Sequence, residues 1–211
     1  MLPIYEKEQS IVKMKNEVKA LEAYLKQACG HEEIHQVEKN IFDFVKKIGR
    51  HALQSFIDES GSGYEDDNPP IDSNEDAMRY KIIRHSAYQS IFGKVRIMRA
   101  GYHDTTQQRY YFPIDSQLNL PQSMYSYLLS NWLLACASET DYRKSVELIN
   151  KIFGLDLSHT VPKRLCAEVA EGVDPFYEEI PAPPEETEGT HIAISADGKG
   201  VPIKKSEESG E

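Results

Sequence analysis

This 211-residue sequence lacks the features of a membrane-spanning, secreted or zinc-binding protein. No apolar run approaches the roughly 20 residues that a helix needs to cross a bilayer. The N-terminus has no basic-then-apolar signal layout. The three cysteines, Cys29, Cys136 and Cys166, lie far apart and form no Cys-x-x-Cys pair, so we expect buried apolar side chains in place of disulfides or zinc ligands. A cytoplasmic location without a membrane partner follows by default.

The sequence also has no excess of positive charge. Its formal net charge of −10 argues against a chain that coats nucleic acid uniformly, although a local basic patch is compatible with it. Much of the acidity falls in residues 65–76 and 178–188, which we expect to be solvated loops. With 40% hydrophobic and 27% charged residues, the rest has the composition of an ordinary folded protein.

Two long amphipathic helices are predicted at the N-terminal end. Apolar residues recur at three- and four-residue steps over residues 6–28 and again over residues 32–59. These helices would pair as an antiparallel hairpin or contribute to a coiled-coil dimer. A structural arm is the first interpretation, and a homodimer formed through the arm is the second.

A β-hairpin follows a linker at residues 61–78. Residues 85–91 and 94–102 are rich in β-branched and aromatic side chains and meet at Phe92-Gly93, and residues 110–112 could add a third strand. Its aromatic side chains and its basic side chains Arg84, Lys94, Arg96 and Arg99 suit contact with phosphates. The alternative is an ordinary solvated face of a sheet.

Helices return after the hairpin. We expect one from Pro121, one capped by Asp141 that runs to Phe153, and one from Ser158 to Tyr177, with a glycine-containing turn between the last two. This arrangement resembles a helix-turn-helix, in which the second helix reads the major groove. An αα-hairpin inside a core is the alternative. The candidate DNA-binding residues of the hairpin and helices are Arg96, Arg99, Lys151, Ser158, His159, Thr160, Lys163 and Arg164.

The C-terminal residues combine a proline- and glutamate-rich linker with a strand. After the linker at residues 181–189, residues 191–195 alternate as a strand does, and Asp197-Gly198 is a turn signal. A carboxylate at the end of a strand can hold divalent metal, but by spacing alone Asp197 is a hairpin turn residue.

Several segments over roughly residues 80–204, which follow one another in the same order, together resemble the N-terminal half of ISKra-type insertion-sequence transposases. They are SIFGKVRI (90–97), RAGY (99–102), FPID (112–115), LNLP (118–121), YSYLL (125–129), FYEE (176–179) and SADGKGVP (195–202). The sequence departs from many relatives near residues 102–112, where a Cys-x-x-Cys pair is often found. Zinc is therefore not assigned.

The resemblance implies a DDE transposase, in which a DNA-binding part precedes a ribonuclease-H-like core that uses Mg²⁺ or Mn²⁺. Asp197 matches the first catalytic acid and would be a metal ligand. Only about fourteen residues follow it, so the second Asp and the final Glu have no place here. We therefore expect an N-terminal fragment without strand-transfer or nuclease activity of its own and without tightly bound metal. Its partners would be the element's terminal repeats and the missing C-terminal half, in the bacterial nucleoid.

The predicted fold is α+β and predominantly helical. A stand-alone DNA-binding or dimerising protein that inhibits transposition is the alternative function, and a remnant without function is the third. The expected parts are a helical arm (residues 1–60), a linker (61–78), a hairpin plus helical DNA-binding domain (79–180), a second linker (181–189) and the start of a ribonuclease-H-like domain (190–211).

Overall fold

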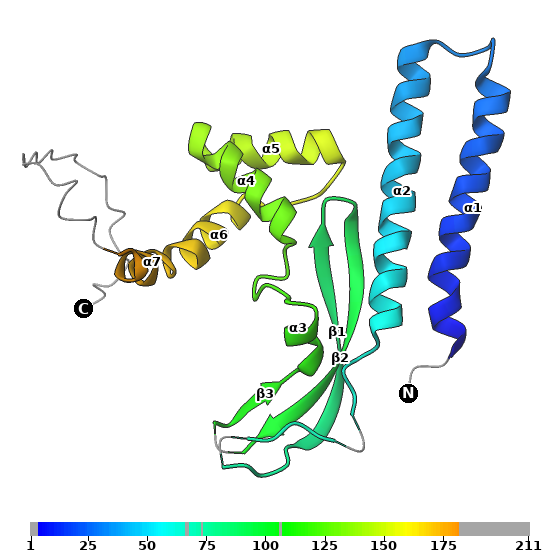
Figure 1. Cartoon of the computed structure of the whole chain (residues 1–211). Coiled ribbons are helices and arrows are strands. Elements are labelled where there is room, and N and C mark those ends of the chain that lie inside the picture. The colour runs from blue at the N-terminus through cyan, green and yellow to red at the C-terminus, as the bar shows by residue number, and fades with distance from the viewer. Residues whose placement is uncertain (1–3, 66–67, 73, 106, 182–211) are drawn as a thin grey trace, which may run out of the picture. The chain divides into compact units, whose positions relative to one another are not determined.

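The computed structural model describes residues 4–65, 68–72, 74–105 and 107–181 (Figure 1). The fold is α+β and mainly helical, with one three-stranded antiparallel sheet, as the sequence predicts. The chain divides into two compact units, residues 1–171 and residues 172–211. The expected linker after Pro181 and the expected ribonuclease-H-like segment lie outside the described residues, and the proposed domain boundaries stay predictions.

The arm is an antiparallel pair of long helices, α1 (Ile4–Ala28) and α2 (Ile34–Ser60) (Figure 1). The chain reverses after α1 at Gly30, whose φ of +78° suits a residue without a side chain. Near the reversal, the rings of Tyr24 and Phe44 pack with centroids 5.8 Å apart. Both predicted helices are confirmed, with ends within two residues of those expected.

The sheet is built on a long hairpin of β1 (Arg79–Ser90) and β2 (Gly93–Asp104), and β3 (Arg109–Tyr111) pairs with the far end of β2. The hairpin turns at residues 91–92, and Gly93 follows with a φ of +108°. The predicted hairpin and third strand are therefore confirmed, and both strands of the hairpin are longer than expected.

Helix α2 covers the free edge of β2. The side chain of Gln54 accepts a hydrogen bond from Arg96 N at 2.7 Å and donates one to Arg96 O at 2.8 Å. An exposed strand edge offers unpaired backbone groups to other chains, and this amide closes it locally. Beside it, Ile57 packs with Val95 and Ile97, so the arm and the sheet share an apolar cluster.

After the sheet, three helices pack against one another: α4 (Tyr127–Glu139), α5 (Tyr142–Phe153) and α6 (Val161–Ala170). We call them the three-helix unit. Their apolar sides enclose one buried cluster, which is formed by Leu129, Leu133, Val146, Ile149, Leu157, Val161 and Leu165. The segment before α4 pairs with β1, because Gln89 N donates to Met124 O at 2.9 Å and Ser126 N donates to Gln89 O at 2.8 Å. The unit is thereby joined to the hairpin.

Two predicted helix ends are wrong. The helix expected from Pro121 begins at Tyr127, where the hydroxyl of Ser126 accepts a hydrogen bond from Leu129 N at 3.1 Å. The helix expected to run to Tyr177 stops at Ala170. A separate helix, α7 (Val173–Glu179), belongs to the second unit.

A short helix, α3 (Pro113–Gln117), follows β3 and contacts β2. Among the described residues, no helix combines the length and the apolar character that crossing a bilayer requires.

Candidate nucleic-acid interface

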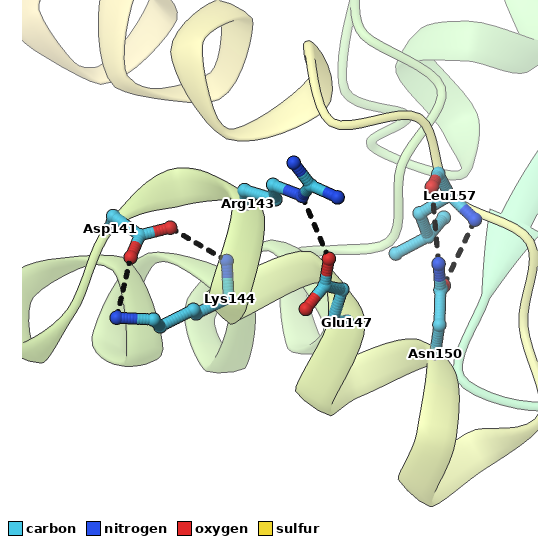
Figure 2. Close-up of polar contacts among 6 residues, drawn as sticks. All are labelled: Asp141, Arg143, Lys144, Glu147, Asn150 and Leu157. Atoms are coloured by element: carbon cyan, nitrogen blue, oxygen red, sulfur yellow. Dashed lines mark hydrogen bonds and ion pairs between the residues drawn. The ribbon is translucent and has the colours of Figure 1, made fainter.

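The N-terminus of α5 is fixed by its cap and by ion pairs on its exposed side (Figure 2). One carboxylate oxygen of Asp141 accepts a hydrogen bond from Lys144 N at 2.9 Å, and the other lies 3.1 Å from Lys144 Nζ. The hydrogen bond from this backbone N–H holds the pKa of Asp141 below its ordinary value. Arg143 pairs with Glu147 at 2.9 Å on the next turn. The predicted cap is confirmed.

The turn between α5 and α6 is held by the side chain of Asn150 (Figure 2). Its Nδ2 donates to Leu157 O at 3.1 Å, and its Oδ1 accepts from Leu157 N at 2.9 Å. Gly154 ends α5 in the left-handed conformation, with a φ of +65°. The side chain of Leu157 is buried in the cluster of the three-helix unit. The start of α6 is therefore tied to both the backbone and the core of the unit.

Helix α6 has one apolar side and one basic side at its N-terminal end. Val161, Pro162 and Leu165 are buried. Lys163 and Arg164 are exposed, and neither forms an ion pair with a described residue. The guanidinium of Arg164 lies 4.9 Å from the centre of the Tyr125 ring, a cation–π distance that fixes its direction.

The three polar residues before α6 are all exposed. The hydroxyls of Ser158 and Thr160 lie 2.9 Å apart, and Ser158 Oγ also accepts a hydrogen bond from Thr160 N at 3.3 Å. Ser158 therefore shapes the turn, while His159 is exposed and forms no hydrogen bond or ion pair through its side chain with the described residues. Lys151, on the last turn of α5, is exposed as well.

The two predicted residues of the hairpin have different surroundings. Arg96 is exposed, and Gln54 holds its backbone. Arg99 has a side chain only 13% exposed, and its Nη1 lies 2.7 Å from Asp115 Oδ2. Its guanidinium also lies 4.3 Å from the centre of the Phe112 ring. Arg99 thus joins β2 to α3.

The Arg99–Asp115 pair is only partly satisfied. Arg99 Nε and Asp115 Oδ1 are buried and have no hydrogen-bond partner among the described residues. Burial raises the pKa of Asp115 above its ordinary value, in spite of the opposing effect of the arginine charge. A charge that is already paired and partly buried is poorly placed to meet phosphate, so we leave Arg99 out of the surface proposed below.

Two basic residues beside this surface, Lys46 and Arg50, were not among the predicted sites, whereas Lys94 belongs to the basic hairpin that the sequence predicts. A Cβ built on Gly154 would lie 3.2 Å from Lys46 Nζ, and one built on Gly93 would lie 3.7 Å from Arg50 Cδ. Lys46 and Arg50 both belong to α2. Lys94 follows Gly93 directly and is exposed. The run of basic residues at positions 46, 47 and 50 was a signal in the sequence, but nothing local indicated that it would meet the hairpin turn and the end of α5.

The predicted catalytic acid and metal ligand, Asp197, lies outside the described residues, so Mg²⁺ or Mn²⁺ binding stays a prediction. Within the part of the chain that the structure describes, no group of three or more His, Cys, Asp or Glu side chains could hold a metal ion. Comparisons with protein-family models, with curated proteins and with solved structures find no match to this chain.

Proposed function

We propose that the chain binds double-stranded DNA through the three-helix unit, with the N-terminal part of α6 in a groove. The observation that carries this proposal is the basic exposed side of α6, where Lys163 and Arg164 stand opposite the buried Val161, Pro162 and Leu165. A helix that needed this side for packing would not place two cations there. The polar side of α6 is thus available to a ligand while the unit stays folded.

The dimensions and the dipole of α6 suit this role. Its ten residues span about 15 Å, and the major groove of B-DNA is about 12 Å wide. The positive end of the helix dipole lies at Thr160 and Val161, next to the exposed Ser158 and His159, and favours a phosphate there. Ala167, one turn beyond Lys163, is exposed and small, so it allows close approach to base edges.

We further propose that this DNA binding serves DNA transposition, as the resemblance of the ordered segments to insertion-sequence transposases suggests. In that role the three-helix unit and the hairpin would hold the terminal repeats, and Asp197 would contribute to a metal site of a ribonuclease-H-like core. The alternative is a regulatory protein that binds the same DNA without catalysis. The proposal of DNA binding is common to both.

The test is the binding of the purified chain to a labelled duplex of mixed sequence, about 30 base pairs or roughly 100 Å long. Lys163→Ala combined with Arg164→Ala should weaken binding and make the plot of log affinity against log salt shallower by about 0.9 per lost phosphate contact. Lys19→Ala combined with Lys26→Ala on α1 is the control, since it removes the same charge from exposed positions. If the parent chain does not bind at low salt, or if the two double variants behave alike, the proposal is wrong.

Exposed apolar residues on the arm favour a homodimer as a second proposal. Ile11, Val18 and Leu25 recur at seven-residue steps on α1 and are each about two-fifths exposed, and Phe42 and Val45 of α2 are exposed as well. Light scattering should give twice the chain mass of 24.0 kDa for the parent. Val18→Glu combined with Val45→Glu should give the mass of one chain. A parent that stays monomeric at high concentration would contradict this proposal.

A further inference from the structure

Basic side chains from two elements, α2 and β2, meet beside the turn of the hairpin. A Cβ on Gly49 would lie 2.7 Å from the ring of Phe92, so α2 passes directly over this turn. Arg50, the next residue of α2, reaches Gly93, and Lys94 follows at the start of β2. The close packing at Gly49 is what brings a cation of the arm to the hairpin.

The directions of the hairpin side chains place two cations on its open face. Val95 and Ile97 point into the cluster with α2, and side chains alternate along a strand. Lys94 and Arg96 therefore point to the opposite face, where both are exposed. Arg50 reaches Gly93 and is one helical turn before Gln54, whose side chain holds the backbone of Arg96.

The same group of cations continues to the end of α5. Lys46 is one helical turn before Arg50 and reaches Gly154, where the turn between α5 and α6 begins. Lys46 pairs with Asp43 at 2.8 Å and faces the negative end of the α5 dipole, so its charge is largely used within the protein. Lys151, three residues before Gly154, is exposed and adds a positive charge in the last turn of α5.

Scattered surface lysines are common, but this group differs from that background. The chain has a formal net charge of −10, and yet three exposed cations come from separate elements: Arg50 and Lys94 at the hairpin turn, and Lys151 in the last turn of α5, where Lys46 of α2 reaches Gly154. None of the three forms an ion pair with a described residue. Unpaired cations next to a groove-binding helix suit the sugar–phosphate strands that border the groove.

We propose that Arg50, Lys94 and Lys151 contact the sugar–phosphate backbone of the duplex beside the segment that α6 enters, so that the helical arm is part of the DNA-binding surface. We call these three residues the backbone seam. This inference rests on the proposed function and adds a second contact region to it. The seam carries no sequence information, because every phosphate offers the same charge, and so it fixes the position of the protein on the duplex.

The test compares two triple variants on the same duplex of about 30 base pairs, with affinity measured over a range of salt concentrations. Arg50→Ala, Lys94→Ala and Lys151→Ala together remove the seam. Lys15→Ala, Lys19→Ala and Lys26→Ala together remove the same charge from exposed positions on α1. Far-UV circular dichroism should show that both variants keep the helical content of the parent.

The seam variant should bind more weakly than the parent, with a salt dependence shallower by up to about 2.7, at about 0.9 for each contact. The α1 variant should keep the parent's slope. If the seam variant also keeps the parent's slope, while Lys163→Ala combined with Arg164→Ala loses affinity, the proposal of the backbone seam is wrong and the proposed function stands. A parent chain that binds no duplex overturns both. Weaker binding with an unchanged slope also contradicts the seam, because it shows that no phosphate contact was lost.

Discussion

The three-helix unit and the helical arm differ in what happens to their apolar side chains. In the unit, Leu129, Leu133 and Val146 are fully buried in one cluster. In the arm, Leu25 is 42% exposed, and Phe42 and Val45 are similarly exposed. Three helices can enclose a cluster between them, whereas two helices can only cover each other along one line. The unit thus encloses an apolar cluster of its own, although Leu128, Leu148 and Ile152 on its surface are about as exposed as Leu25. The arm has an apolar surface that nothing described in the structure covers, and its buried Ile57 packs with the sheet.

The arm is attached to the sheet by the hydrogen bonds of Gln54 with the backbone of Arg96 and by apolar contacts. Ile57 belongs to the cluster with Val95 and Ile97, and Gly49 receives the ring of Phe92. Beyond these contacts, toward the reversal at Gly30, the Lys46 side chain reaches Gly154, and α1 and α2 pack mainly against each other. The comparison therefore predicts that stability is concentrated in the three-helix unit and at the contacts of α2 with the sheet.

The largest effect is expected for Leu133→Ala. This side chain is fully buried, so its loss should reduce the free energy of unfolding by about 2–5 kcal/mol. Trp132 is the only tryptophan and stacks on Phe153 at 5.2 Å, so its fluorescence reports the unfolding of this unit in urea. A loss below about 1 kcal/mol would mean that the cluster is not packed as described.

A smaller effect is expected for Gly49→Ala, which tests the contact between the arm and the hairpin. The new methyl group would meet the Phe92 ring at 2.7 Å, so overpacking should cost about 1–3 kcal/mol. In an open helix the same change would stabilise by about 1 kcal/mol, and the sign of the effect is therefore informative. Adding Phe92→Leu should recover much of the loss, as urea unfolding would measure. Stabilisation by the single change would show that the ring moves away freely.

A still smaller effect is expected for Leu25→Ala, the matched change in the arm. Because this leucine is 42% exposed, the loss in a dilute sample should be about 1 kcal/mol or less. If two arms pair, the loss should grow with protein concentration, since the residue then becomes buried. Urea unfolding at a low and at a high protein concentration measures the loss of stability under each condition. A loss equal to that of Leu133→Ala in the dilute sample would remove the contrast between the two regions.

The sequence predicts those parts of the fold that depend on local pattern. The periodic apolar residues of α1 and α2 and the short turn before Gly93 are local signals, and the structure agrees with them. The start of α4 was missed, because its segment is directed by pairing of Met124 and Ser126 with Gln89 on β1. That pairing joins residues far apart in the sequence, and no periodicity indicates it.

The sequence likewise predicts only those parts of the candidate interface that depend on local pattern. The cap at Asp141 and the exposed cations of α6 follow from their own helices. The burial of Arg99 depends on Asp115, which is sixteen residues away on another element. Arg50 meets Gly93 only because α2 folds along the free edge of β2. Tertiary contacts of this kind decide which cations remain available for a ligand.

The smallest effect is expected at Asp141, the cap of α5, which lies on the surface of the three-helix unit. Asp141→Ala removes the acceptor for Lys144 N and should lower the stability of the unit slightly. Asp141→Asn keeps an acceptor of similar capping strength, so its effect should be smaller still. Thermal unfolding followed by Trp132 fluorescence measures each difference from the parent.

The pH dependence separates the charge of Asp141 from its hydrogen bond. The pKa of this carboxyl is lowered in the folded chain, chiefly by the hydrogen bond from Lys144 N, so folding favours the ionised form. The stabilisation is therefore fully present above the ordinary aspartate pKa of about 4, and it is lost as the pH falls through the lower folded value. The gap between the parent and Asp141→Ala should narrow over this acid range, while the gap between Asp141→Asn and Asp141→Ala stays constant because neither side chain titrates. A parent that keeps its full advantage in acid would show that the cap does not depend on the carboxylate charge.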